Sequence, residues 1–263
     1  MSAALHPDAV PPAPPVGPSR RGRLIGVASG KGGVGKTWFA VTLAQALARH
    51  GRRVLLADGD LGLANVDVQI GLSPTVTLDA GLMARRPLRE LAQGHAAGFH
   101  VLPGRSGSGA MAGAAAAWGD LLIDLLGSAR GEWDDVLLDI GAGLDPAARR
   151  MAAACDLLLV VATDEPTSLT DAYAVLKLHG RDAPGRDARI VVNMAADGVE
   201  GLRTHATLAR ACTNFLGRTV PLAGVVRRDP KVRDAIRHQT PLLTRHPSCT
   251  AAQDVEALAR GLI

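Results

Sequence analysis

Residues 24–51 constrain the fold more than any other part of this chain. They open with an apolar run over residues 24–27, pass through a glycine-rich loop, and continue as a helical pattern that stops at Gly51. The loop has the spacing G-x-x-x-x-G-K-T, and its residues are Gly30, Lys31, Gly32, Gly33, Val34, Gly35, Lys36 and Thr37. This spacing between a strand and a helix is typical of a phosphate-binding loop.

The residue types of the loop suit a bound nucleoside triphosphate. Glycines let the backbone curl so that its N–H groups converge on phosphate oxygens, and the following helix points the positive end of its dipole at the same anion. We expect Lys36 to reach the β- and γ-phosphates of ATP and the Thr37 hydroxyl to bind Mg²⁺. An ordinary glycine-rich turn, the alternative, would not account for this lysine–threonine pair.

The rest of the chain alternates between apolar strands and helical stretches. Helical patterns, including residues 168–179 and 202–215, separate the strands. The strands are expected at residues 54–58, 136–139, 157–161, 189–193 and 222–226. Continuous apolar strands between helices predict a single α/β domain, with a doubly wound, mostly parallel sheet covered on both faces.

The first 20 residues differ from this pattern. They contain the prolines Pro7, Pro11, Pro12, Pro14, Pro15 and Pro18. Proline is excluded from helix interiors and central strands, so we expect a disordered tail over residues 1–20 and a P-loop ATPase domain over residues 21–263. That length is sufficient for a sizeable core.

Composition restricts the compartment and the partners. The formal net charge of +4 permits contact with nucleic acid or anionic lipid without demanding it. Three widely spaced cysteines form no disulfide framework and no C-x-x-C pattern. The sequence contains no apolar run of about 18 residues and no signal-peptide core. These features favour a cytoplasmic protein.

Two of the expected strands end in acidic residues. Ligands of parallel sheets bind outside the carboxyl ends of the strands, so these carboxylates should lie beside the phosphates. Asp139 is the expected Walker B residue, which binds Mg²⁺ directly or through water. Asp58 and Asp60 bracket Gly59, where a carboxylate can orient or polarise the attacking water. The alternative for all three aspartates is a turn or a helix cap at the end of a strand.

The loop resembles the deviant Walker A motif of the MinD/ParA family, which is marked by the additional lysine at position 31. Residues 58–67 resemble the MinD-like branch of this family. Three later segments, residues 139–143, 165–173 and 229–233, resemble the members that control the number and placement of flagella. The resemblance extends from about residue 23 to residue 250.

This resemblance implies a switch that is driven by ATP. In the family, ATP drives a face-to-face homodimer, and the lysine equivalent to Lys31 crosses to the phosphates of the opposite subunit. A cation supplied in trans stabilises the charge of the transferring phosphoryl group. Asp60 matches the catalytic aspartate of the family and Asn193 the asparagine that contacts adenine, although Asn193 could also be a turn residue.

The candidate residues therefore fall into three groups. The catalytic candidates are Lys31, Lys36 and Asp60. The nucleotide-binding candidates are residues 30–37, Asp58 and Asn193. The candidate Mg²⁺ ligands are Thr37 and Asp139.

The flagellar resemblance also implies protein partners, namely an FlhF-type GTPase, a transcription activator or components of the flagellar switch.

Two features depart from the family. The segment 251–262 has an apolar stripe, but Arg260 is its one basic residue. This pattern favours a final helix packed in the core over a membrane anchor. Peripheral contact with the inner membrane or the cell pole stays open. The tail lacks the Asp-Gln-Ala motif with which related proteins activate FlhF.

Two other functions stay open. A partition ATPase would bind non-specific DNA to position a chromosome, plasmid or other cargo. The basic residues Arg227, Arg228, Lys231, Arg233 and Arg237 could contact its phosphates, although such a run is more often a solvated face. A small-molecule kinase is the weaker alternative, because nothing in the sequence supplies an acceptor site.

Overall fold

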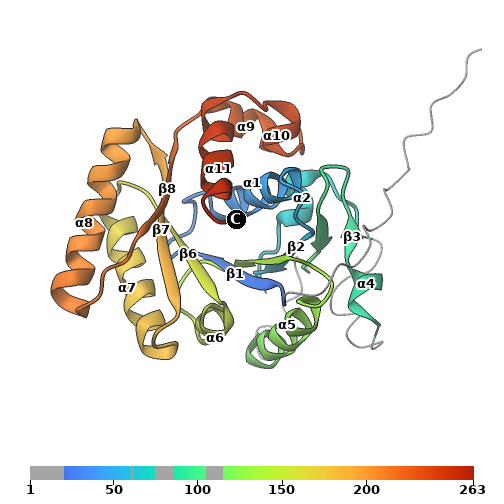
Figure 1. Cartoon of the computed structure of the whole chain (residues 1–263), viewed down its shortest axis with the longest axis horizontal. Helices are drawn as coiled ribbons and strands as arrows, with labels where there is room; N and C mark the ends of the chain where they lie inside the picture. The colour runs from blue at the N-terminus through green and yellow to red at the C-terminus, as the bar shows by residue number, and fades with distance from the viewer. Residues whose placement is uncertain (1–20, 61, 75–85, 105–114) are drawn as a thin grey trace, which may run out of the picture.

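The computed structural model describes residues 21–60, 62–74, 86–104 and 115–263. The expected tail over residues 1–20 lies outside the described residues. In the described part, a sheet forms the middle layer and helices cover both of its faces (Figure 1).

The sheet has eight strands in the order β3-β4-β2-β5-β1-β6-β7-β8. Their bounds are β1 Arg23–Ala28, β2 Val54–Gly59, β3 Gln93–Gly94, β4 His100–Leu102, β5 Asp135–Ile140, β6 Leu157–Ala162, β7 Asp187–Ala195 and β8 Leu222–Arg227. Neighbouring strands pair in parallel except β3, which is antiparallel to β4. The predicted doubly wound, mostly parallel sheet is therefore confirmed. The short edge strand β3 and its neighbour β4 were not predicted.

Two layers of helices enclose this sheet (Figure 1). One face carries α1 Lys36–Arg49, α2 Val66–Ile70, α9 Pro230–Arg237, α10 Leu242–Arg245 and α11 Thr250–Arg260. The other carries α4 Leu88–Leu91, α5 Ala115–Ala129, α6 Pro146–Ala154, α7 Pro166–Asp182 and α8 Gly198–Leu216.

A separate hydrophobic core fills each layer. Leu24 and Leu138 belong to the core under α5–α8, whereas their strand neighbours Ile25 and Leu137 belong to the core under α1 and α11. Successive side chains of a strand point to opposite faces, so a strand buried on both faces must be apolar throughout. This requirement explains the continuous apolar runs in the sequence.

The final helix α11 packs into the second of these cores, as predicted. Its stripe is buried there and consists of Ala251, Ala252, Val255, Leu258, Ala259 and Leu262. Arg23 of β1 fixes the end of the chain, because its Nη1 donates a hydrogen bond of 2.6 Å to the carbonyl oxygen of Leu262. Among the described residues, no helix is both long and apolar enough to cross a membrane.

Candidate nucleotide-binding site

The glycine-rich loop connects β1 to α1 at the carboxyl edge of the sheet. Gly33 and Gly35 both have φ of 82°, a left-handed conformation that side chains other than glycine rarely adopt. Gly35 is the N-cap of α1, and no side chain caps that end of the helix. The backbone N–H groups of the first turn are thus available to an anion.

Three hydrogen bonds fix the path of the loop. The Ser29 hydroxyl donates to the carbonyl oxygen of Lys31 over 3.0 Å, within the loop itself. The Gly143 N–H, from the loop after β5, donates to the carbonyl oxygen of Ser29 over 2.9 Å. The Asn193 amide, from β7, donates from Nδ2 to the carbonyl oxygen of Val34 over 2.8 Å. The loop that follows β5 and the strand β7 therefore hold the glycine-rich loop from two sides of β1.

Gly30 allows α7 to approach the loop closely. A β-carbon at this position would lie 2.4 Å from the carbonyl oxygen of Asp171 in α7. Any residue with a side chain would therefore push the helix away from the loop.

Lys36 and Asp139 form a buried ion pair beneath the loop. Lys36 Nζ lies 2.7 Å from Asp139 Oδ1, and the two side chains are 8% and 1% exposed. Burial raises the pKa of Asp139, while the Lys36 ammonium and the Thr37 hydroxyl oppose that shift. Asp139 Oδ2 is buried and has no hydrogen-bond partner among the described residues. The expected Walker B carboxylate therefore lies next to the loop with one oxygen unused.

Asp58 has its oxygens occupied by backbone groups. Oδ1 accepts a hydrogen bond from the N–H of Asp60 (3.0 Å), and Oδ2 accepts from those of Asn65 (2.8 Å) and Val66 (3.0 Å). Burial, with repulsion from Asp139, raises the pKa of Asp58 to about 6. The side chain thus shapes the turn between β2 and α2, as the turn-residue alternative predicts.

Asp60 lies at the surface of the site, against the loop that follows β5. Its Oδ1 accepts hydrogen bonds from the N–H groups of Gly62 (3.2 Å) and Leu63 (2.9 Å). A β-carbon at Gly141 would lie 3.4 Å from Asp60 Cγ, so this glycine leaves room for the carboxylate. Asp60 is close enough to Asp139 to contribute to its raised pKa. The structure therefore brings Lys36, Asp139 and Asp60 together, as the strand-end argument predicts.

Lys31 points toward the start of α7. Its Nζ lies 2.5 Å from Glu165 Oε2 and 2.9 Å from Thr167 Oγ1. Hydrogen bonding and charge from Lys31 lower the pKa of Glu165. Sequence reasoning missed both partners of Lys31, although residues 165–173 belong to a segment that resembles the family. Within one chain, the Lys31 ammonium is thus paired with two side chains at the start of α7.

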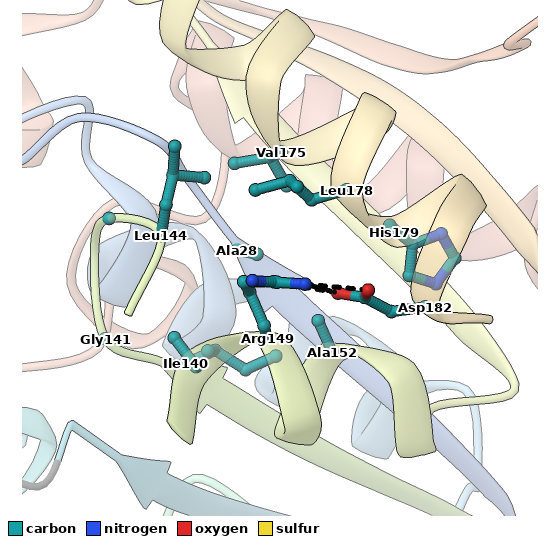
Figure 2. Close-up of a pocket in the computed structure, with 12 residues that line it drawn as sticks. Ala28, Ile140, Gly141, Leu144, Arg149, Ala152, Val175, Leu178, His179 and Asp182 are labelled. Atoms are coloured by element: carbon teal, nitrogen blue, oxygen red, sulfur yellow. Dashed lines mark hydrogen bonds and ion pairs between the residues drawn. The ribbon is translucent and has the colours of Figure 1, made fainter. Parts of the chain in front are cut away.

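A groove lies between α6 and α7 and reaches the loop that follows β5 (Figure 2). Its volume is about 330 Å³, counting the part open to solvent. Arg149 of α6 crosses it to Asp182 of α7, with 2.8 Å between Nε and Oδ2 and 2.7 Å between Nη2 and Oδ1 (Figure 2). His179 lines its wall, and burial lowers the pKa of this imidazole. Sequence reasoning gave no sign of this groove.

Residues 25–242 match the model of the CobQ/CobB/MinD/ParA nucleotide binding domain. The antiactivator FleN of Pseudomonas aeruginosa is 37% identical over 238 residues, which cover 90% of this chain and 85% of FleN. The flagellum site-determining protein YlxH of Helicobacter pylori is 28% identical over 245 residues, covering 92% and 82% of the two chains.

Among solved structures, the septum site-determining protein MinD of Pyrococcus horikoshii, in complex with Mg-ADP, has a TM-score of 0.77 and 25% identity. The match covers 91% of this chain and 95% of that protein.

Proposed function

This chain belongs to the CobQ/CobB/MinD/ParA family of P-loop nucleotide-binding proteins, and we propose that it is an Mg²⁺-dependent ATPase that dimerises with ATP and controls flagellar number or placement. Hydrolysis of ATP is the activity of the MinD/ParA members of the family. The dimerisation, the metal dependence and the regulated process are the parts that we propose. The buried pair of Lys36 and Asp139 beneath the glycine-rich loop is the observation that carries the proposal.

The oxygen atoms near this pair fit Mg²⁺. Asp139 Oδ2 is buried without a partner, and the Thr37 hydroxyl is near enough to lower the pKa of the same carboxylate. Mg²⁺ in nucleotide sites takes one or two protein oxygens together with phosphate oxygens. Thr37 and Asp139 would hold the ion, which would neutralise charge on the β- and γ-phosphates when bound.

The other side chains have distinct roles in this mechanism. The N–H groups of the loop and the start of α1 bind the phosphates, and Lys36 adds a fixed positive charge beside them. Asp60 orients or polarises the attacking water, since its carboxylate lies at the open side of the site against Gly141. Asp58 supports this arrangement by fixing the turn that carries Asp60.

Lys31 would complete the site of a second copy. In the single chain its ammonium is held by Glu165 and Thr167, both at an exposed surface. An exposed ion pair is screened by water and contributes little to stability, so Lys31 can be released at little cost. We propose that it then reaches the phosphates of the partner subunit, so that hydrolysis removes part of the dimer interface.

The flagellar role comes from the relatives, which include an antiactivator and a flagellum site-determining protein. We propose partners in the flagellar system: an FlhF-type GTPase, a transcription activator or switch components. We also propose a cytoplasmic location, with residues 1–20 forming a tail outside the ATPase domain of residues 21–263. In this reading the chain acts like FlhG, also called FleN.

Size-exclusion chromatography of the Asp60→Ala protein tests the switch. We expect a dimer with Mg-ATP and a monomer with Mg-ADP, because blocked hydrolysis preserves the ATP-bound state. Lys31→Ala in the same background should stay a monomer while still binding ATP. An Asp60→Ala protein with Lys31 intact that stays monomeric with saturating ATP would contradict the proposed dimer.

Flagellar counts test the regulated process. Deletion of the gene should change the number or position of flagella per cell. The wild-type gene should restore them, whereas a Lys36→Ala copy should not. Normal flagella in the deletion strain would contradict the flagellar role.

The DNA-binding alternative has weaker support in the structure. Arg227, the first residue of the basic run, forms a two-bond ion pair with Asp254 of α11, 2.7 Å between Nη2 and Oδ1. The positive charge of Arg227 is thus already paired with a carboxylate of the same chain. An ATP-dependent, salt-sensitive shift of duplex DNA would nevertheless favour the partition role.

A further inference from the structure

The strand β7 contains a bulge at the position where it contacts the glycine-rich loop. Its residues Val192 and Ala195 pair with Val225 and Arg227 of β8, so β7 advances by three residues while β8 advances by two. The additional residue is accommodated with Met194 at φ 58°, a left-handed conformation that is uncommon for a residue with a side chain. Bulges of this kind redirect a side chain and occur next to functional sites.

The bulge coincides with an asparagine whose side chain contacts the loop. Asn193 is 3% exposed, and its Nδ2 donates a 2.8 Å hydrogen bond to the carbonyl oxygen of Val34. A β-carbon at Gly35 would lie 2.5 Å from the same Nδ2. The amide therefore sits directly against the peptide that joins Val34 to Gly35, one residue before Lys36.

This contact sets the direction of an N–H group. In a trans peptide, the C=O and the N–H point in opposite directions across the plane. Because the carbonyl of Val34 points at Asn193, the N–H of Gly35 points away from it. The amide thus stabilises one orientation of this peptide, and a peptide flip would break a buried hydrogen bond.

We propose that Asn193 is a positioning residue that holds the phosphate loop in its anion-binding conformation. It then controls affinity for the diphosphate part of a nucleotide, whichever base is attached. This role differs from the contact with adenine that the family resemblance implies for Asn193. The inference rests on the proposed nucleotide site.

The two roles predict different responses to Asn193→Ala. If the amide holds the loop, binding of Mg-pyrophosphate and of Mg-ADP should weaken by a similar factor, about tenfold for the loss of one buried hydrogen bond. The ratio of ADP affinity to GDP affinity should stay unchanged. If the amide only contacts the base, pyrophosphate binding should stay unchanged and the ADP preference should fall.

Calorimetric titration of the full chain with Mg-ADP, Mg-GDP and Mg-pyrophosphate separates these outcomes. Asn193→Asp is the second variant, since it keeps the shape of the side chain but cannot donate to Val34. Asn214→Ala, at an exposed position of α8, is the matched control and should bind all three like the wild type. Melting temperatures identify any variant that fails to fold.

Three results would overturn the positioning role: unchanged pyrophosphate binding in both variants, a loss confined to ADP, or a changed ratio of ADP to GDP. A steady-state assay gives a further readout, because a displaced loop should raise KM for ATP as well as lower kcat. If the wild-type protein binds neither ADP nor pyrophosphate, the proposed nucleotide site itself fails, which is a distinguishable outcome.

Discussion

Lys36 Nζ lies 2.7 Å from Asp139 Oδ1, and neither side chain has more than 8% of its surface exposed. A buried ion pair thus joins the first residue of α1 to β5. Each of the two buried charges is stabilised by the other, because an isolated buried charge is strongly disfavoured. The pair is therefore a structural element of the fold as well as part of the candidate site.

Lys36→Ala should abolish nucleotide binding and also destabilise the protein. The lysine supplies the positive charge beside the phosphates, and its removal leaves Asp139 without a counter-charge. Removing one partner of a buried pair costs about 3–5 kcal/mol. Titration with Mg-ADP measures the first effect, and urea unfolding measures the second.

The double variant Lys36→Ala with Asp139→Asn separates these two effects. It removes both charges, so most of the lost free energy of unfolding should return while nucleotide binding stays absent. A single Lys36→Ala variant as stable as the wild type would show that the pair contributes nothing to the fold.

Asp60→Asn and Asp60→Ala should both stop ATP turnover without preventing ATP binding. The asparagine keeps an oxygen that can accept from the N–H groups of Gly62 and Leu63, whereas alanine removes it. If the carboxylate acts on the attacking water, both variants lose activity equally. Measured phosphate release at the parental rate in Asp60→Asn would assign Asp60 to the turn alone.

The strand–loop–helix unit and the acidic residues at the strand ends could be predicted from the sequence for a physical reason. A phosphate loop is a local structure, and the carboxyl ends of parallel strands meet at one edge, so Lys36, Asp139 and Asp60 had to lie close together. Periodicity also predicted the burial of the stripe in α11.

The contacts of Lys31 and Asn193 could not be predicted in the same way. Lys31 meets Glu165 across 134 positions and Asn193 meets Val34 across 159 positions. These contacts depend on how α7 and the bulge in β7 are placed, which no local pattern specifies. The strands β3 and β4 were missed because runs of two and three residues are too short to show a period.

Asp58 should make the stability of the protein depend on pH. Its pKa in the folded chain is about 6, above the ordinary value of 3.8. Between these values the folded state holds a proton that the unfolded state releases, so the free energy of unfolding falls as pH rises through this window. A pKa raised from 3.8 to about 6 corresponds to a loss of about 3 kcal/mol in the free energy of unfolding across this window.

Urea unfolding between pH 4 and pH 8 measures this dependence. The wild type should lose stability relative to Asp58→Asn as the pH rises, because the variant has no carboxylate to ionise. The comparison uses only the slope of the free energy of unfolding against pH, and not the absolute stability of the variant. Parallel curves over the whole range would contradict a raised pKa for Asp58.

Leu258→Ala should destabilise the protein by about 3 kcal/mol, because the side chain fills the core beneath α11. Leu258 is 4% exposed, and a β-carbon at Gly224 of β8 would lie 2.8 Å from its Cδ1. The glycine thus leaves the space that this leucine occupies. Chemical denaturation measures the loss, and Leu63→Ala is the matched control because Leu63 is 73% exposed.

The same packing predicts the behaviour of α11 toward lipid. With its apolar stripe in the core, the wild-type protein should not float with vesicles of anionic lipid, whether or not ATP is present. Binding would require the helix to leave β8, which exposes the buried side chains to water. Flotation of the wild type together with an unchanged stability of Leu258→Ala would show that α11 is a detachable membrane helix instead of part of the core.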